Sequence, residues 1–385
     1  MTRIFVPAET HTEERRIAVV PATVAKLSKL GAQVEIEAGL GQSVFFSDDE
    51  YAAAGATIMK SRQQGLGHAD IVLRLRKPPA DEIKQTKAGC LHISHLDPFN
   101  DLELLQQLAD AKLSSICMEM IPRSTVAQKM DALSSQANLG GYVAVMIGAN
   151  RLDRIFPMMS TPSGTIAPAK VFVIGVGVAG LQAIATAKRL GAVVEAFDTR
   201  PVVEEQVKSL GAKFVKVDLG ETGQTAQGYA KELTPEQLEK QREVMAQRCA
   251  QSDLVITTAQ VFGRKAPRIV TTAMVQGMKP GSVVVDMAVE TGGNVECSVL
   301  GEEVIVNDVR VLGYRNLPGR VPRVASEMYS NNLGNLIDHF WDKESKSFKL
   351  DPANDILKHC LVTHQGSVTN ETLRNLIETQ LVPTA

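Results

Sequence analysis

Apolar and polar residues in the first third of the chain alternate between a helical period and a strand period. Apolar residues recur at Val24, Leu27 and Leu30, and Gly31 follows them, which is typical of an amphipathic helix and its end. Residues 33–37 then alternate apolar and polar, as in a half-buried strand. Four other short apolar runs, separated by helical segments, are also typical of strands: residues 3–7, 70–74, 89–93 and 115–118. This alternation favours a mostly parallel α/β sheet.

The middle of the chain predicts a connection and then a second sheet. Residues 127–150 have a helical pattern that Gly140 and Gly141 interrupt, so we expect one or two connecting helices. The second sheet begins near Ala169. It is expected to run strand, helix and strand, then a helix–strand step and three later strands: residues 170–174, 181–190, 193–197, 203–217, 253–257, 282–287 and 309–313.

The tail of the chain predicts a discontinuous first domain. Past Pro322 the pattern is helical over residues 328–341, then charged, then helical to the end. We expect this tail to pack back on the first domain. The predicted fold is therefore α/β, with two Rossmann-like domains, each a mostly parallel sheet flanked by helices, and a cofactor cleft between them. The expected domains are residues 1–140 with 325–385, and residues 141–324.

The sequence also contains a weak internal echo. Residues 24–35 resemble residues 184–195, and both predict a helix, a glycine and a strand. Two similar α/β domains would produce this echo. Chance explains it equally well, because Leu-Gly-Ala after a helix is common in α/β folds.

Composition narrows the class of protein. The 385 residues are 44% hydrophobic and 4% aromatic with a formal net charge of −2, which does not suggest a nucleic-acid surface. Five scattered cysteines fit buried thiols in a reducing compartment better than a disulfide framework or a zinc site. The chain starts without the apolar segment of a signal peptide, and its longest uncharged stretch, residues 171–187, falls just short of a membrane span. We expect a soluble chain without a membrane span of its own.

One glycine pattern predicts a dinucleotide site. Residues 171–180 are a strand followed by Gly175, Gly177 and Gly180 in the spacing G-x-G-x-x-G, with Val178 and Ala179 opening a helix. Gly175 is expected to make the tight turn, Gly177 to let the backbone approach a pyrophosphate, and Gly180 to let the helix pack on the strand. The pyrophosphate would lie at the N-terminus of the helix. The alternative is an ordinary α/β turn whose glycines serve packing.

The end of the next strand bears on which nucleotide binds. Asp198 lies 23 residues after Gly175, where a carboxylate accepts hydrogen bonds from the adenosine ribose and repels a 2′-phosphate. This favours NAD over NADP. Thr199 and Arg200 follow and are further candidates for cofactor binding, although an arginine here would also suit the 2′-phosphate of NADP.

Residues 218–233 are too polar for a core. They are rich in glycine, threonine and glutamine, and Tyr229 is their single aromatic residue. Loops of this length inside a compact domain are usually functional lids or disordered insertions. One interpretation is a mobile flap in which Gly228 and Tyr229 cover the bound nucleotide; the other is a surface insertion.

Two stretches, residues 118–139 and 173–200, together resemble a known family. They are similar to the NAD(H)-binding component (alpha subunit, domain I) of proton-translocating NAD(P) transhydrogenase, in the alanine dehydrogenase and transhydrogenase family. The likeness extends over nearly the whole chain, including residues 15–21, 227–232 and 280–286.

The resemblance implies a function and a set of partners. Hydride would pass between NAD(H) on this chain and NADP(H) on a partner component, coupled to proton passage through a membrane-spanning component. The chain would be a homodimer at the cytoplasmic face of a bacterial inner membrane. Because it stops at Ala385 without an apolar stretch long enough to span a bilayer, we expect a separate peripheral subunit or a piece cut at a domain edge.

The resemblance also implies the site residues. Arg123, Gln128, Asp131 and Ser134 would hold the nicotinamide end in the cleft between domains, with Arg123, Gln128 and Asp131 closest to the chemistry. Its further cofactor contacts are listed together: Lys129, Met130, Gly175, Gly177, Val178, Ala179, Gly180, Asp198, Thr199, Arg200, Gly228, Tyr229 and Gln260.

The chemistry of these residues suits that role. Gln128 and Asp131 lie three apart and would share a helix face, and their amide and carboxylate can bond a carboxamide and a ribose. The alternative is ordinary polar decoration at a helix N-terminus. Hydride transfer needs two rings held close and water excluded, rather than an acid or a base. No metal site is expected, since His92 and His95 lack spacing partners.

Two other functions compete. An alanine dehydrogenase would use a histidine, an arginine for the substrate carboxylate and a lysine; His95 and Arg16 match the first two, but Arg76 stands where the lysine is expected. An arginine does not give up its proton to act as a base, although Lys77 is only one place away. The second competitor is a nucleotide-binding regulatory module without activity of its own.

Overall fold

The computed structural model describes residues 1–218 and 234–381, which form two compact units. Unit 1 comprises Met1–Gln136 and Val321–Ala385, and unit 2 comprises Ala137–Arg320. Helix α6 (Ala132–Arg151) begins in unit 1 and continues in unit 2. Among the described residues, no helix has the length and apolar character needed to cross a bilayer.

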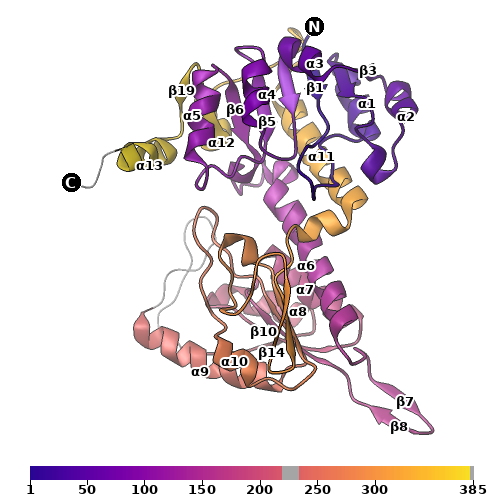
Figure 1. Cartoon of the computed structure of the whole chain (residues 1–385), viewed down its shortest axis with the longest axis vertical. Coiled ribbons are helices and arrows are strands. Elements are labelled where there is room, and N and C mark those ends of the chain that lie inside the picture. Colours follow the sequence, from indigo (N-terminus) through magenta and orange to yellow (C-terminus); the bar gives the residue numbers. More distant parts are fainter. Residues whose placement is uncertain (219–233, 382–385) are drawn as a thin grey trace. The chain divides into compact units, whose positions relative to one another are not determined.

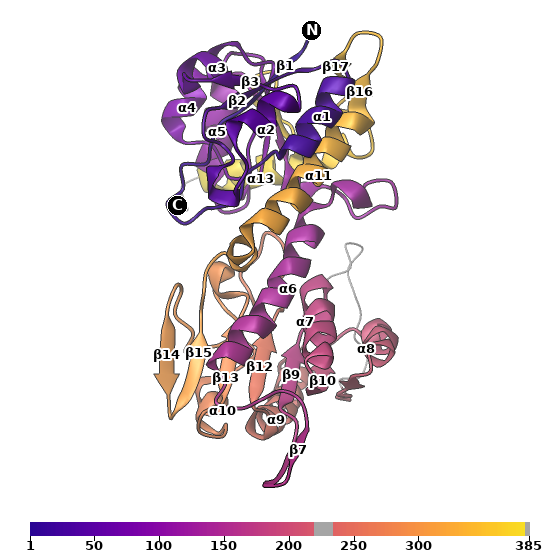
Figure 2. The same cartoon turned by 90° about the vertical axis from the view of Figure 1, so that its right-hand side faces the viewer.

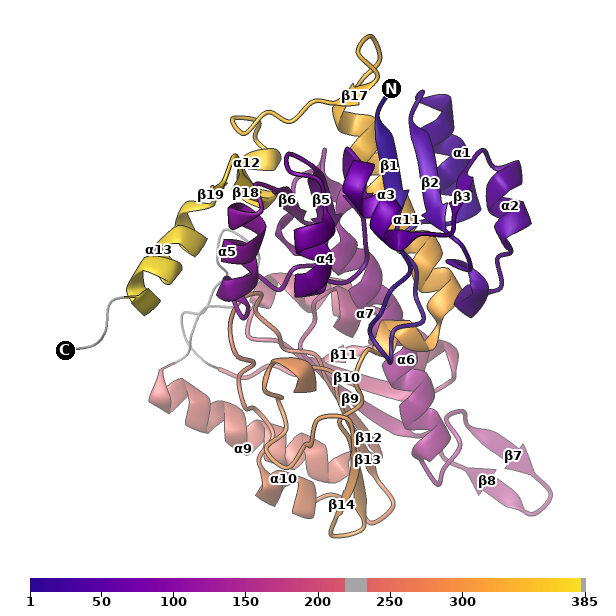
Figure 3. The ribbon, with the colours of Figure 1, turned by 45° about the horizontal axis from the view of Figure 1, so that its top comes forward.

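Unit 1 is built on an eight-stranded sheet with the order β19-β18-β6-β5-β4-β1-β2-β3 (Figure 3). Its first six strands along the chain are parallel: β1 (Arg3–Val6), β2 (Gln33–Glu37), β3 (Thr57–Met59), β4 (Ile71–Leu73), β5 (Leu91–Ser94) and β6 (Ser114–Cys117). The order reverses between β1 and β4, which is the arrangement of a Rossmann-type sheet.

Alternate residues of these strands supply the cores on the two faces of the sheet. Ile4 and Val6 of β1 pack with α1 and α11, whereas Phe5 between them packs with α3, α4 and α5. The period of two along a strand is the cause. The helices of unit 1 are α1 (Pro21–Lys29), α2 (Asp48–Ala53), α3 (Arg62–His68), α4 (Ala80–Gln85), α5 (Leu102–Asp110), α11 (Pro322–Phe340), α12 (Leu357–Cys360) and α13 (Glu371–Leu381).

The tail packs on unit 1 as predicted, but not as helices alone. Strand β18 (Leu361–His364) pairs antiparallel with β6, and β19 (Ser367–Val368) pairs with β18. A short hairpin of β16 (Trp341–Asp342) and β17 (Ser347–Phe348) precedes them. The prediction of helix to the end was wrong because the four residues of β18 take their pairing from a strand more than two hundred residues earlier.

Unit 2 has a seven-stranded sheet with the order β11-β10-β9-β12-β13-β15-β14 (Figure 2). All pairs are parallel except β14 with β15. The order reverses between β9 and β12, again as in a Rossmann-type sheet. The strands are β9 (Lys170–Ile174), β10 (Val193–Phe197), β11 (Lys213–Phe214), β12 (Leu254–Thr257), β13 (Val283–Asp286), β14 (Glu303–Val306) and β15 (Val309–Leu312).

Helices cover both faces of this sheet. Met245 and Cys249 of α9 (Pro235–Gln251) and Met274 of α10 (Thr272–Gln276) belong to the core on one face. Helix α6 lies on strands β12 and β13, and α7 (Val178–Arg189) lies on β9 and β10 (Figure 2). A short helix, α8 (Glu204–Ser209), follows β10. The prediction of two Rossmann-like α/β domains is therefore confirmed.

The glycine pair in α6 marks a close helix contact rather than an interruption. Residues 132–151 form one continuous helix, and its α-helical part starts five residues later than residue 127. A Cβ at Gly141 would lie 2.2 Å from the carbonyl oxygen of Ala179 in α7. The pair is there because α7 approaches α6 too closely for a side chain.

The two halves of the sequence echo occupy equivalent places in the two sheets. Gly31 ends α1 at φ +89° before β2, and Gly191 ends α7 at φ +92° before β10. Each glycine thus precedes the second strand of a sheet with the same strand order.

One element of unit 2 lies outside its sheet. Strands β7 (Met159–Thr161) and β8 (Gly164–Ile166) form an exposed two-stranded hairpin (Figure 1), which the sequence patterns did not predict. The 3₁₀ turns are Gln42–Val44, Met118–Met120, Gln128–Met130, Pro201–Val203, Val289–Thr291 and Leu317–Arg320.

Candidate functional site

The turn after β9 is built around glycines that no other residue replaces without displacement. Gly175 has φ +94°, and a Cβ there would lie 2.8 Å from the hydroxyl of Thr258. A Cβ at Gly180 would lie 2.0 Å from the carbonyl oxygen of Gly175. Both glycines therefore let α7 start directly against the end of β9.

Gly177 differs from its two neighbours in the pattern. Its φ is −84°, which every residue adopts, and among the described residues a Cβ there would meet nothing within 4 Å. Gly177 is the N-cap of α7, and no described side chain caps the helix. The first-turn amides of Val178 and Ala179 thus lie at a helix N-terminus that carries partial positive charge.

The turn lies at the point where the strand order of unit 2 reverses. The Thr258 hydroxyl, just after β12, donates to the Gly175 carbonyl at 2.9 Å and links the two strands that flank this point. Ligands of open α/β sheets bind at such a switch point, beyond the carboxyl ends of the strands. Thr258 is a site residue that the sequence analysis missed; its position directly after a buried strand was the available signal.

Asp198 is the acceptor for much of the surrounding backbone and for one arginine. Its carboxylate accepts hydrogen bonds from the Val176 amide at 2.7 Å and the Arg200 amide at 2.9 Å. The Arg200 side chain adds a bidentate pair, from Nε at 2.9 Å and Nη2 at 2.7 Å, and this bonding raises the pKa of Arg200. Thr199 lies between them, half-buried.

A buried polar network supports the loop after β12. Asp286, at the end of β13, accepts from the Thr257 hydroxyl at 3.1 Å and from the amides of Asn294 and Val295 at 3.2 and 3.1 Å. Asn294 in turn accepts from the Ala259 amide at 3.0 Å and donates to its carbonyl at 2.8 Å. Sequence analysis missed this network, although a carboxylate at the end of a buried parallel strand was visible.

Gln260 continues that loop at the surface. Its side-chain amide donates to the Met287 carbonyl at 3.1 Å, which fixes the loop after β12 to the end of β13. The candidates Gly228 and Tyr229, and the proposed flap around them, lie outside the described residues.

The predicted nicotinamide-binding segment belongs to unit 1. Arg123, Gln128 and Lys129 are exposed, whereas the Met130 side chain is buried in the core of that unit. The Lys129 carbonyl accepts hydrogen bonds from Asn332 and Asn335 of α11, each at 3.0 Å, and these fix the path of the segment.

Asp131 lies before α6 rather than within it. Its carboxylate accepts from the Ser134 amide at 2.9 Å and the Ser134 hydroxyl at 2.6 Å, which is the bonding of a helix N-cap. Gln128 stands in a separate 3₁₀ turn, Gln128–Met130, so the prediction of a shared α-helix face was wrong. The competing preference of aspartate for capping explains why the helix starts at Ala132.

The residues that an amino-acid dehydrogenase would use have other partners. Arg16 forms a bidentate pair with Glu14, and the Arg76 Nε donates to the same carboxylate at 2.7 Å. Lys77 is paired with Asp101. Glu14 is a residue that sequence analysis missed, since nothing in its pattern distinguishes it from Glu13.

His95 contacts a carboxylate and a tyrosine. Its Nδ1 lies 3.5 Å from Glu119, and its ring is 5.1 Å from the ring of Tyr329. Burial raises the pKa of Glu119, but His95 and the amides of Leu96 and Asp97, which donate to it, lower that pKa to about 2. Among the described residues, no three His, Cys, Asp or Glu side chains gather as metal ligands would.

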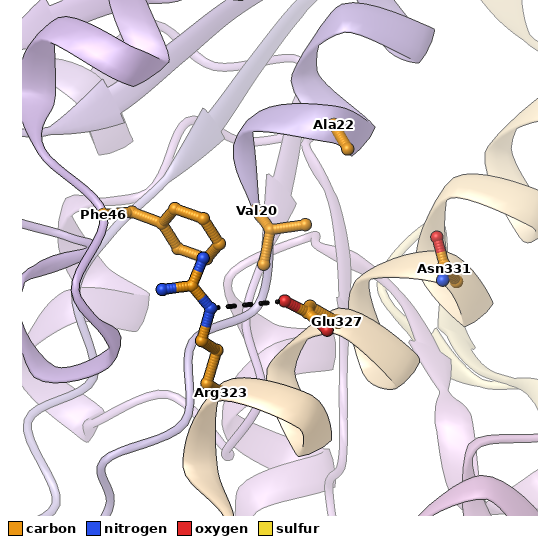
Figure 4. Close-up of a pocket in the computed structure, with 6 residues that line it drawn as sticks. All are labelled: Val20, Ala22, Phe46, Arg323, Glu327 and Asn331. Carbon is orange, nitrogen blue, oxygen red and sulfur yellow. Dashed lines mark ion pairs between the residues drawn. The ribbon is translucent and has the colours of Figure 1, made fainter.

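A shallow pocket of about 360 Å³ in unit 1 is separate from these residues (Figure 4). Arg323 in its wall lies 4.4 Å above the Phe46 ring and 3.5 Å from Glu327 (Figure 4). Val20, Ala22 and Asn331 complete the lining. None of the predicted site residues lines this pocket.

A Rossmann-type sheet with a glycine turn at its switch point, an uncapped helix N-terminus and an aspartate after the next strand defines a dinucleotide-binding α/β protein. Models of the alanine dehydrogenase/PNT family match residues 5–140 (N-terminal domain) and 144–371 (C-terminal domain). The chain belongs to this family.

Individual relatives narrow the family. The chain is 42% identical over 378 residues to the first of the NAD(P) transhydrogenase subunit alpha polypeptides of Rhodospirillum rubrum, covering 96% of this chain and 98% of that protein. It is 29% identical to alanine dehydrogenase of Mycobacterium tuberculosis, covering 96% and 95%. A crystal structure of transhydrogenase from Sinorhizobium meliloti is similar with a TM-score of 0.86 and 43% identity, covering 95% and 99%. The predicted resemblance to transhydrogenase alpha subunits is thus confirmed.

Proposed function

We propose that this chain is the NAD(H)-binding subunit of a proton-translocating NAD(P) transhydrogenase. Bound NAD(H) supplies or accepts the hydride, and its counterpart is NADP(H) on a partner component. The observation that carries the proposal is the switch-point turn, where Gly177 leaves open backbone beside the uncapped N-terminus of α7. Phosphate groups bind such helix N-termini through amide hydrogen bonds and the helix dipole.

Each candidate residue then has a role in holding the nucleotide. We assign the pyrophosphate to Gly175, Gly177 and the first turn of α7, and the adenosine ribose to Asp198. Arg200 is already engaged by Asp198, which favours NAD over NADP. We assign the nicotinamide end to Arg123, Gln128, Asp131 and Ser134. These residues position the ring, since hydride transfer requires no protein acid or base.

The wider assembly is part of the same proposal. By analogy with its transhydrogenase relatives, the chain works as a homodimer with an NADP(H)-binding component and a membrane-spanning component at the cytoplasmic face of a bacterial inner membrane. Proton passage belongs to the membrane component, and this chain contributes the nucleotide and its orientation.

A reconstituted hydride-transfer assay tests the proposal. The full chain is mixed with a purified NADP(H)-binding component, and transfer between NADH and an oxidised NADP analogue is followed by absorbance. Rapid exchange that needs both proteins is expected. Tight NADH binding without exchange would favour a regulatory module, and turnover of pyruvate and ammonia with NADH would favour an amino-acid dehydrogenase.

A further inference from the structure

The carboxylate of Glu14 is held as a bound ligand would be held. It accepts four hydrogen bonds: the Arg16 amide at 3.0 Å, Arg16 Nε at 2.8 Å, Arg16 Nη2 at 2.7 Å and Arg76 Nε at 2.7 Å. The Arg16 contacts form the two-pronged pair that guanidinium groups make with carboxylates. The Glu14 side chain is 0% exposed, so this anion is withdrawn from water.

The arginine at the centre of this arrangement is anchored independently of Glu14. Arg16 is 6% exposed, and its Nη1 donates to Gln136 at 2.8 Å. Gln136 itself donates to the Ala325 carbonyl at 3.0 Å. The following backbone is tied to α11, because the Ile17 amide donates to the Ser326 hydroxyl at 2.9 Å. Removing the Glu14 carboxylate therefore leaves the guanidinium in place.

Glu14 comes from a part of the chain that is easy to change. It lies in the irregular segment between β1 and α1, so its side chain contributes to no helix or strand. Its charge is nonetheless retained: burial raises the pKa of Glu14, but the hydrogen bonds and charges of Arg16 and Arg76 lower that pKa to about 2. The site therefore holds an ionised carboxylate at neutral pH.

We infer that Arg16 and Arg76 form a binding site for a small monocarboxylate, and that Glu14 is its built-in occupant. A buried guanidinium is stable only with an anionic partner, and a carboxylate supplied by the chain excludes a free one by mass action. The site is thereby closed to formate, acetate and 2-oxo acids.

This closure has a consequence that rests on the proposed function. Arg16 bonds Gln136 in the second turn of α6, and the first turn of that helix carries Ser134, a candidate for the nicotinamide end. A free 2-oxo acid is a hydride acceptor, so a filled carboxylate site keeps such acids from being held near the segment assigned to the nicotinamide.

Chemical rescue tests the inference. In the full chain, Glu14→Ala removes the occupant and leaves both arginines. We expect the unfolding midpoint of E14A to fall relative to wild type, and then to rise by roughly 2–4 °C with acetate, formate or pyruvate as the site fills. Wild type should show no such rise. Sodium chloride at equal ionic strength is the reference for simple screening.

Two matched variants complete the design. Glu13→Ala removes the same charge one residue away, where the side chain is exposed, and should respond like wild type. E14A combined with Arg16→Leu should lose the rescue. An E14A that responds no more to acetate than to chloride overturns the inference. If E14A does not fold alone, carboxylates must restore its native circular dichroism; failure to do so also overturns it.

The inference and the proposed function fail in distinguishable ways. NADH titration of wild type tests the function, because it involves unit 2 and is independent of Glu14. Acetate rescue of E14A tests the carboxylate site. A wild type that does not bind NADH, together with a rescued E14A, would remove the first and leave the second.

Discussion

Arg200 and Asp198 form a bidentate ion pair at the end of β10, with Nε–Oδ1 and Nη2–Oδ2 distances of 2.9 and 2.7 Å. The same Asp198 oxygens accept the amides of Val176 and Arg200. A single carboxylate thus orients the glycine turn and also binds the one nearby arginine that would suit a 2′-phosphate. The choice between the two nucleotides depends on this pair.

Asp198→Asn should shift nucleotide preference toward NADP(H). The substitution removes the charge that repels a 2′-phosphate and frees Arg200 from its partner. We expect NADH affinity to fall by about tenfold or more, since a hydrogen bond to a charged group contributes about 1.5–3 kcal/mol. The ratio of NADPH to NADH affinity should rise. Fluorescence titration measures both, with Glu195→Gln on the same strand as control. Equal preferences in the two variants would contradict this role.

The glycines of the turn should separate stability from binding. Gly180→Ala places a Cβ 2.0 Å from the Gly175 carbonyl oxygen, so α7 must shift and the unfolding midpoint should drop by several degrees. Gly177→Ala meets no described atom within 4 Å and should leave the midpoint within about 1 °C of wild type. Its methyl group should still weaken NADH binding. If G177A binds NADH like wild type, the pyrophosphate does not lie there.

Gln128→Ala should impair hydride transfer without affecting the fold. The Gln128 side chain is exposed, so its loss should leave the unfolding midpoint unchanged. We expect the transfer rate to fall on the order of tenfold, because a misoriented ring loses the benefit of fixed geometry. Stopped-flow transfer and NADH titration give the two quantities separately. Gln63→Ala, also exposed in unit 1, is the matched control and should leave both unchanged.

His92 should make unit 1 sensitive to mild acid. Burial and the charge of Arg74 lower the pKa of His92 to about 3 from 6.5. Between these values the unfolded chain binds a proton that the folded chain does not, so stability falls as pH falls from 6.5 toward 3. At pH 5 the loss is about 2 kcal/mol.

Replacement of His92 by leucine should remove that component of the pH dependence. Ser94, the partner of His92 Nε2 at 2.9 Å, already donates to the His95 carbonyl, so no donor is left unpaired. Urea unfolding at pH 7 and pH 5 should show a drop about 2 kcal/mol smaller in H92L than in wild type. His11→Leu, at an exposed position, is the control. An unchanged drop in H92L would mean that other groups cause the acid sensitivity.

Local pattern was sufficient wherever local interactions decide the structure. Strands over residues 33–37, 170–174 and 193–197 appear with the bounds predicted. Their alternation or continuous apolar runs follow from burial on one or both faces, which neighbouring residues already reveal. Among the glycines, the spacing of Gly175 and Gly180 predicted the tight turn and the close helix packing that the structure contains.

Distant partners decided the rest. The tail strand Leu361–His364 exists because β6 pairs with it, and Gly141 lies in an unbroken helix because α7 crosses there. Asp131 caps α6 instead of belonging to it, since its own carboxylate competes for the first amides.

The sequence by itself determined the fold class, the position of the glycine turn and the likeness to transhydrogenase subunits. Only the tertiary structure brought Glu14 to Arg16 and Arg76, engaged Arg200 with Asp198 and placed Thr258 against Gly175. The physical reason is that period and spacing act along the chain, whereas the partner of a buried charge is chosen by the packing of segments remote in sequence.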